Sequence, residues 1–197
     1  MLGAGLIFFL AVLQGASELF PVSSLGHAVV APPLLHLGFH ESDPAFVPVL
    51  TMLHLGTAAA RASQHAAGDP AYARVEGLHW RTALLVGVCQ VAALFPGISR
   101  SGVTMAAGLL AGLRHQEAAR FSFLLATPII LGAGLLEVPD LGPDRPTALL
   151  AAGAAAVAGI IAYVSARFLV RYLRFGRLDP FAYYCAALGI ATLIALR

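Results

Sequence analysis

Leu19-Phe-Pro-Val-Ser-Ser-Leu-Gly-His27 and Leu94-Phe-Pro-Gly-Ile-Ser-Arg-Ser-Gly102 are two variants of one pattern, a proline break followed by paired serines. Glu18 directly precedes the first stretch, and the second stretch carries Arg100. Both lie in a chain that otherwise avoids charge. A polar cluster that occurs twice in an apolar chain indicates two related halves and marks the place to look for a site.

The composition identifies the class of protein. The 197 residues are 59% hydrophobic and 11% charged, and the mean hydropathy is +0.82. Soluble domains carry about a quarter charged residues, so the chain is predicted to be an all-α polytopic membrane protein with a single membrane domain, residues 1–197. The lipid bilayer is then an expected partner, and a net charge of +2 gives no indication of a nucleic-acid partner.

Two pairs of short apolar runs flank the serine stretches: residues 2–13 and 25–37 around the first, and residues 82–95 and 103–113 around the second. Each run is roughly half to two-thirds of the length that a membrane crossing requires. A Gly/Pro/Ser break joins each pair. This pattern is typical of a re-entrant helix hairpin, whose broken backbone must line a protein cavity or water because it cannot face lipid.

Charge asymmetry orients these pieces. Residues 46–60, 121–136, 149–173 and 181–196 are candidates for about four full transmembrane helices. If 46–60 and 121–136 cross fully, every arginine-rich loop falls on the cytoplasmic side, as the positive-inside rule requires. The two hairpins then enter from opposite sides, which is an inverted repeat.

This topology predicts four regions. They are repeat one at about 1–61, a cytoplasmic loop at about 62–81, repeat two at about 82–148 and C-terminal helices at about 149–197.

A new helix is expected to start after each break. Free backbone N–H groups and the helix dipole favour an anion at such a start. Ser23 and Ser24 in the first half, and Ser99 and Ser101 in the second, are candidate N-cap or first-turn residues. Arg100 adds a fixed positive charge with a fork that suits phosphate oxygens. Two helix N-termini and an arginine predict a phosphate or diphosphate site.

His27 and Glu18 add possible chemistry to this site. His27 follows Ser24 by three residues, so the two side chains share a face of a helix. The imidazole could take the serine proton or protonate a leaving oxygen. Glu18 could orient His27 or bind a divalent cation beside the phosphates, and Gln14 extends the polar face by one turn.

Residues 14–27 and 96–104 resemble the two signature motifs of the undecaprenyl-diphosphate phosphatases, and residues 121–133 resemble the helix that follows in that family. The resemblance implies a multi-pass enzyme of the bacterial plasma membrane with inverted re-entrant hairpins. Such an enzyme removes the terminal phosphate of undecaprenyl diphosphate, a polyprenyl diphosphate lipid. The reaction regenerates the carrier for cell-wall synthesis and confers bacitracin resistance.

The resemblance also assigns residues. It places the catalytic or metal-linked carboxylate at Glu18, the active-site serine and histidine at Ser24 and His27, and the phosphate-binding arginine at Arg100. Gln14 stands where many members have a second glutamate, which leaves dependence on a divalent cation such as Mg²⁺ or Ca²⁺ open. The candidate substrate-binding residues are Gln14, Ser23, Gly26, Ser99, Ser101, Gly102 and Thr104.

Several alternatives stay open at this point. Ser24 is the expected nucleophile with His27 as base and acid, and water activated by His27 or Glu18 is the competing mechanism. A transporter or flippase of a polyprenyl phosphate is the alternative function, because an inverted repeat with broken helices suits it equally well. The site is expected to open to the extracytoplasmic side, and a homodimer is compatible with the sequence.

The chain departs from the family in one respect. Only about 40 residues separate Gly56 from Pro96, whereas typical members have a longer insert there that includes an extra helix pair. Loss of an even number of crossings leaves the topology of the following segments unchanged.

Overall fold

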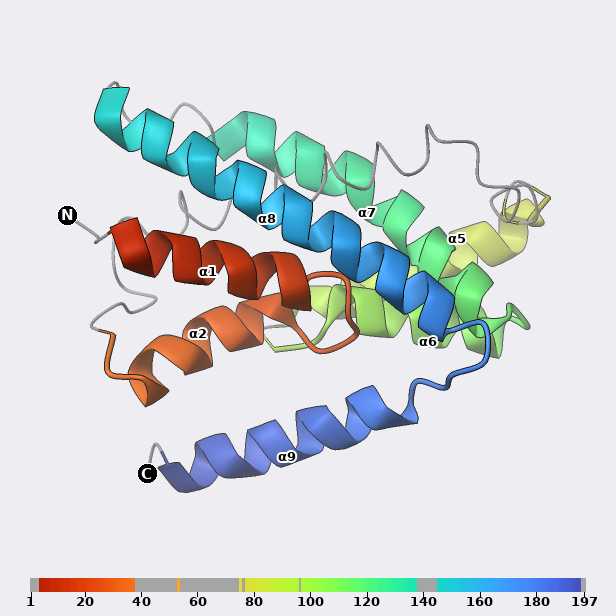
Figure 1. Ribbon diagram of the computed structural model, residues 1–197. Helices are drawn as coiled ribbons and strands as arrows, with labels where there is room; N and C mark the ends of the chain where they lie inside the picture. Colours follow the sequence, from red (N-terminus) through yellow and green to blue (C-terminus); the bar gives the residue numbers. More distant parts are fainter. Residues whose placement is uncertain are drawn as a thin grey trace.

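The computed structural model describes residues 4–37, 53, 75, 77–95, 97–137 and 145–195. In this part of the chain all regular structure is helical (Figure 1), which confirms the all-α prediction there. The helices in chain order are α1 (Ala4–Ser17), α2 (Ser24–Leu34), α5 (Trp80–Cys89), the 3₁₀ helix η1 (Gln90–Leu94), α6 (Arg100–Leu110), α7 (His115–Glu137), α8 (Arg145–Tyr172) and α9 (Asp179–Ala195).

The helices follow the apolar runs of the sequence, but they differ from one another in length. Within the described residues, one segment is long and apolar enough to cross a membrane, Leu149–Tyr172 of α8, with a mean hydropathy of 2.0. The helix α7 has 23 residues but begins with a polar turn, and α9 has 17. Residues 46–60, apart from Leu53, lie outside the described residues. The number of full crossings therefore stays a prediction.

Two helical hairpins meet at their tips. The helices α1 and α2 contact each other on either side of the first serine stretch, and α5 with η1 contacts α6 around the second. Figure 1 shows the hairpins extending from opposite ends of the molecule toward its middle. The Ser101 hydroxyl donates a hydrogen bond to the carbonyl oxygen of Phe20 over 3.0 Å, so the two motifs are in direct contact.

The long helix α8 supports both hairpins. Alanine recurs every fourth residue along one face, and each of these side chains has an exposed fraction of 1% or less: Ala154, Ala158, Ala162 and Ala166. The first two belong to a core cluster with α1, and the last two belong to a cluster that includes Leu19 of the first motif, Met105 of α6 and Phe123 of α7. Small residues in such a stripe let helix backbones approach closely.

Gly15 of α1 lies where α1 and α8 come closest. A Cβ atom at this position would be 2.5 Å from the carbonyl oxygen of Ala158 and 2.8 Å from the Cβ atom of Ile161. Neither neighbour is the flexible end of a long side chain. The glycine is therefore required by the spacing of the two helices that position Glu18.

We expect Gly15→Ala to lower stability, because an added methyl group forces the two backbones apart at a typical cost of about 1–3 kcal/mol. Thermal unfolding of the purified protein in detergent measures the effect. Gly5→Ala, in the same helix with nothing within 4 Å of its added Cβ, is the matched control. It should keep or raise stability, since alanine favours a helix by about 1 kcal/mol over glycine. Equal unfolding temperatures for the two variants would contradict this close approach.

Candidate active site

The first motif ends in a capped helix start. The Ser23 hydroxyl oxygen accepts a hydrogen bond from the backbone N–H of Gly26 over 3.1 Å, and Ser24 is the first residue of α2. Ser23 has a φ of +59°, in the left-handed region that residues other than glycine rarely adopt. This conformation turns the chain sharply between the end of α1 and the start of α2.

The second motif repeats the cap with a relaxed backbone. The Ser99 hydroxyl oxygen accepts from the N–H of Gly102 over 3.1 Å, and α6 begins at Arg100. Ser99 has a φ of −66° and an extended ψ of 116°. The predicted capping and first-turn serines are therefore confirmed in both halves, with Ser24 and Arg100 at equivalent positions just after the cap.

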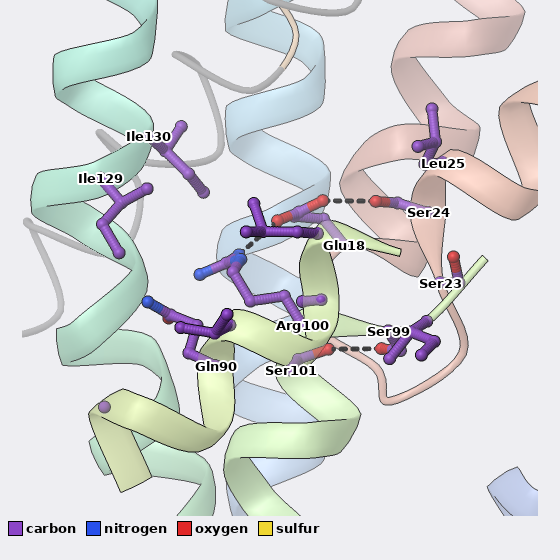
Figure 2. Close-up of a pocket in the computed structure, with 15 residues that line it drawn as sticks. Glu18, Ser23, Ser24, Leu25, Gln90, Ser99, Arg100, Ser101, Ile129 and Ile130 are labelled. Atoms are coloured by element: carbon purple, nitrogen blue, oxygen red, sulfur yellow. Dashed lines mark hydrogen bonds and ion pairs between the residues drawn. The ribbon is translucent and has the colours of Figure 1, made fainter. Parts of the chain in front are cut away.

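The two helix starts converge on the carboxylate of Glu18. Its Oε2 atom accepts from the Ser24 hydroxyl over 2.5 Å and from the Gln14 amide over 2.9 Å. Its Oε1 atom accepts from Nη2 of Arg100 over 2.8 Å. Figure 2 shows Ser24 and Arg100 reaching Glu18 from opposite sides. One carboxylate thus joins the end of α1 to the starts of α2 and α6.

This cluster lines a cavity of about 480 Å³. Polar lining comes from Glu18, Arg100 and the motif serines at positions 23, 24, 99 and 101, together with Gln90. Apolar lining comes from residues such as Leu25, Val91, Ile129 and Ile130. Figure 2 shows Ile129 and Ile130 of α7 facing the polar cluster across this space. A polar end and an apolar wall suit a ligand that is charged at one end only.

The electrostatics of the cavity favour an anion. Glu18 is buried, with an exposed fraction of 6%, and the charge of Arg100 offsets its charge. The starts of α2 and α6 add the partial positive charges of two helix N-termini, about half an elementary charge each. Backbone N–H groups at such starts bind phosphate readily. The arrangement can therefore hold a phosphate beside a hydroxyl and a carboxylate.

His27 lies apart from this cluster. Its Nδ1 atom is 2.7 Å from the carbonyl oxygen of Ser23, and its Nε2 atom is 2.7 Å from the hydroxyl of Tyr184 in α9. The sequence analysis placed His27 as a base for Ser24, but the two side chains form no hydrogen bond, because the Ser24 hydroxyl donates to Glu18 and both ring nitrogens have other partners. Helical spacing therefore did not predict the partners of either side chain.

The remaining predicted residues have supporting positions. Gln14 is buried and holds Glu18, while Gly26 and Gly102 supply the capped N–H groups. Thr104 is 1% exposed; its hydroxyl donates to the carbonyl oxygen of Arg100 over 2.8 Å and lies 2.6 Å from the hydroxyl of Ser122 in α7. Its position favours a role in α6–α7 packing over the substrate contact expected from the sequence.

The donor set was also compared with the needs of a divalent cation. Among the described residues there is no group of three or more His, Cys, Asp or Glu side chains that could hold a metal ion. Both oxygens of Glu18 already accept hydrogen bonds. These side chains alone therefore do not fit a cation. Mg²⁺ sites commonly combine one or two carboxylates with phosphate oxygens of the substrate, so a cation here would need ligands from the substrate.

The sequence analysis missed two polar residues. Gln90 lines the cavity, and its Oε1 atom is buried with no hydrogen-bond partner in the described part of the chain. Gln90 is a lone amide in the apolar run before the second motif, and this feature could have marked it as a candidate site residue. Tyr184 lies in α9, and nothing in its local sequence pointed to His27, 157 residues away.

Comparison with known proteins extends this picture to most of the chain. Residues 61–191 match the family described as bacitracin resistance protein BacA. The undecaprenyl-diphosphatase of Acidiphilium cryptum is 35% identical over 272 residues, which covers 94% of this chain and 95% of that protein. Undecaprenyl-diphosphatase 2 of Chromobacterium violaceum is 37% identical over 265 residues, with 93% and 95% covered.

Both alignments are longer than the 197 residues of this chain, so these relatives contain segments that it lacks. The family match spans about two thirds of the chain and the relatives align along nearly all of it. The chain therefore belongs to the BacA family of bacitracin resistance proteins.

Proposed function

We propose that this protein is a membrane undecaprenyl-diphosphatase. It hydrolyses undecaprenyl diphosphate to undecaprenyl phosphate and inorganic phosphate, which returns the lipid carrier to cell-wall synthesis. Relatives that align along nearly the whole chain carry this name. The observation that carries the proposal is the Glu18 carboxylate, which binds a serine hydroxyl and an arginine between two helix N-termini.

Substrate binding uses the positive elements of the cavity. The terminal phosphate lies against the starts of α2 and α6, where the backbone N–H groups and Arg100 stabilise its negative charge. The apolar wall near Ile129 and Ile130 accommodates the first part of the prenyl chain. Charge that develops in the transition state is stabilised by the same donors, and this is commonly the largest catalytic effect.

Ser24 is the proposed nucleophile and Glu18 its base. The serine hydroxyl already donates to Glu18 Oε2, so this carboxylate is placed to take the proton as Ser24 attacks the terminal phosphorus. The bond from that phosphorus to the bridging oxygen breaks, and undecaprenyl phosphate leaves with the bonding electrons. Water then attacks the phosphoserine, inorganic phosphate leaves, and Ser24 regains a proton. This assignment replaces the His27 base of the sequence analysis.

Two alternatives to this mechanism remain, direct attack by water and participation of a divalent cation. Water activated directly by Glu18 would bypass the phosphoserine. A divalent cation stays a proposal: Glu18 and the oxygens of the diphosphate would hold it, and it would supply positive charge beside the phosphates. Phosphate release in the presence of a chelator, with Mg²⁺ or Ca²⁺ restored afterwards, tests this proposal.

The membrane arrangement is part of the proposal. Two re-entrant hairpins meet as an inverted repeat, formed by residues of about 1–61 and 82–148 around a cytoplasmic loop at about 62–81. The contact between Ser101 and Phe20 at the hairpin tips supports this arrangement. About four further helices cross the bacterial plasma membrane, and the cavity opens to the extracytoplasmic side. Association of two copies as a homodimer also stays a prediction.

A polyprenyl-phosphate transporter or flippase would use the same phosphate site. It has no need for the hydroxyl–carboxylate pair, so Ser24→Ala would leave lipid movement across liposomes intact. The 2.5 Å hydrogen bond between Ser24 and Glu18 therefore favours the phosphatase.

We expect Ser24→Ala to lower the rate of phosphate release from undecaprenyl diphosphate by about a thousandfold, in line with the loss of an activated nucleophile and its base. Colorimetric phosphate measurement on purified protein checks this. Ser165→Ala, which changes a serine of α8, should retain activity. A loss below about tenfold in a folded Ser24→Ala variant would favour direct attack by water.

Arg100→Lys tests the phosphate contact while keeping the charge. Lysine lacks the planar fork that binds a carboxylate and a phosphate together, so we expect a fall in kcat/KM of about a hundredfold or more. Arg167→Lys, at an exposed α8 position that contacts Tyr163, is the control. Unchanged kcat/KM in Arg100→Lys would rule out a bidentate role for Arg100.

A further inference from the structure

A contact between α2 and α9 fixes the ring of His27. The Tyr184 hydroxyl lies 2.7 Å from Nε2 of His27, and the two rings are stacked with centroids 5.6 Å apart and planes within 5° of parallel. His27 is buried, with an exposed fraction of 8%. The contact borders a second cavity of about 290 Å³, lined mostly by apolar side chains. The His27–Tyr184 contact itself is part-buried, because Tyr184 is 47% exposed.

The contacts of the imidazole define its tautomer. Nδ1 faces the carbonyl oxygen of Ser23 over 2.7 Å. A carbonyl oxygen only accepts hydrogen bonds, so Nδ1 must carry the proton. In the neutral ring Nε2 is then an acceptor, and the Tyr184 hydroxyl donates to it. The hydrogen-bond partner of Nδ1 thus determines that Nε2 is unprotonated in the neutral ring.

The chain of contacts leads to the proposed nucleophile. Ser23 has the left-handed φ of +59° and caps α2, and a backbone of this kind persists only where its surroundings hold it. The carbonyl oxygen of this residue accepts from the ring of His27 over 2.7 Å and from its backbone N–H over 3.2 Å, and the ring makes the shorter contact. The next residue, Ser24, bonds Glu18. The orientation of Ser24 therefore depends on the ring of His27.

One face of the helix α9 packs against the first motif. Phe181, Tyr184 and Cys185 have helical i, i+3, i+4 spacing. Phe181 stacks on Phe20 with centroids 5.5 Å apart, and the Cys185 sulfur is 3.8 Å from the carbonyl oxygen of Pro21. None of the residues of α9 is fully buried. These few specific contacts therefore set its register.

We propose that Tyr184 is a positioning residue of the active site. Its hydroxyl holds the ring of His27 in one orientation, and through Ser23 it keeps Ser24 directed at Glu18. This inference rests on the proposed phosphatase function. It assigns a role to α9, which contributes no residue to the cavity that contains Glu18.

Tyr184→Phe is the direct test, because it keeps the stacked ring and removes only the hydroxyl group. We expect kcat for phosphate release to fall about tenfold, the scale of losing one hydrogen bond, while KM stays within about twofold because Arg100 and the helix N-termini are unchanged. Tyr183→Phe is the matched control, since Tyr183 is 75% exposed. It should retain the kcat of the unmodified protein.

Two further measurements separate positioning from general stability. The ¹⁵N chemical shift of His27 Nε2 should be the same in the unmodified protein and in Tyr183→Phe, and it should change in Tyr184→Phe, because this nitrogen loses the hydroxyl group that donates to it. In a His27→Ala background, Tyr184→Phe should cause no further loss of kcat, because the two residues act through one contact.

The outcomes are distinct. A fall in kcat together with a change in the His27 shifts supports the proposal. An unchanged kcat, unchanged shifts, or an equal loss in Tyr183→Phe overturns it. If the unmodified protein releases no phosphate, the proposed function fails, and the shifts still decide whether Tyr184 holds His27.

Discussion

One buried carboxylate connects the parts of this protein. Removing one partner of a buried ion pair costs about 3–5 kcal/mol, and Glu18 is 6% exposed. Its partners are Gln14 one turn earlier, Ser24 at the start of α2 and Arg100 at the start of α6. Because Arg100 is 82 residues away in the sequence, the ion pair forms only when the tips of both hairpins meet. The site is therefore assembled only when the two halves of the protein have folded against each other.

In the proposed mechanism the same carboxylate is the base in a site that also binds an anion. A carboxylate alone would repel phosphate, but the charge of Arg100 offsets it at 2.8 Å. The partial positive charges at the starts of α2 and α6 then remain to attract the ligand. Because these groups are fixed by the fold, they need not reorganise when the ligand binds. The proposed base and the proposed anion site can coexist here because Arg100 pairs directly with the carboxylate.

Much of this arrangement could be predicted from the sequence, and the exceptions have a common cause. Apolar runs predicted the described helices, and the serines that follow each proline break predicted both caps. Spacing predicted a shared face for Ser24 and His27, yet a side chain at a helix start leans over the preceding turn, where Glu18 lies. The ring of His27 instead meets Tyr184 of α9, and Thr104 meets Ser122 of α7. Such contacts depend on how distant helices pack, which local spacing does not encode.

The repeat matters because its halves have diverged at one position. Both capped helices, α2 and α6, have 11 residues and the same bond from the capping serine to a glycine N–H. The first helical residue is Ser24 in one half and Arg100 in the other, so a hydroxyl and a cation reach one carboxylate from opposite sides. Only the half with the hydroxyl has a left-handed cap residue, which costs about 1–3 kcal/mol. Two identical halves would present two hydroxyls or two cations. In the proposed mechanism it is this divergence, rather than the repeat itself, that assigns the attack to Ser24 and charge stabilisation to Arg100.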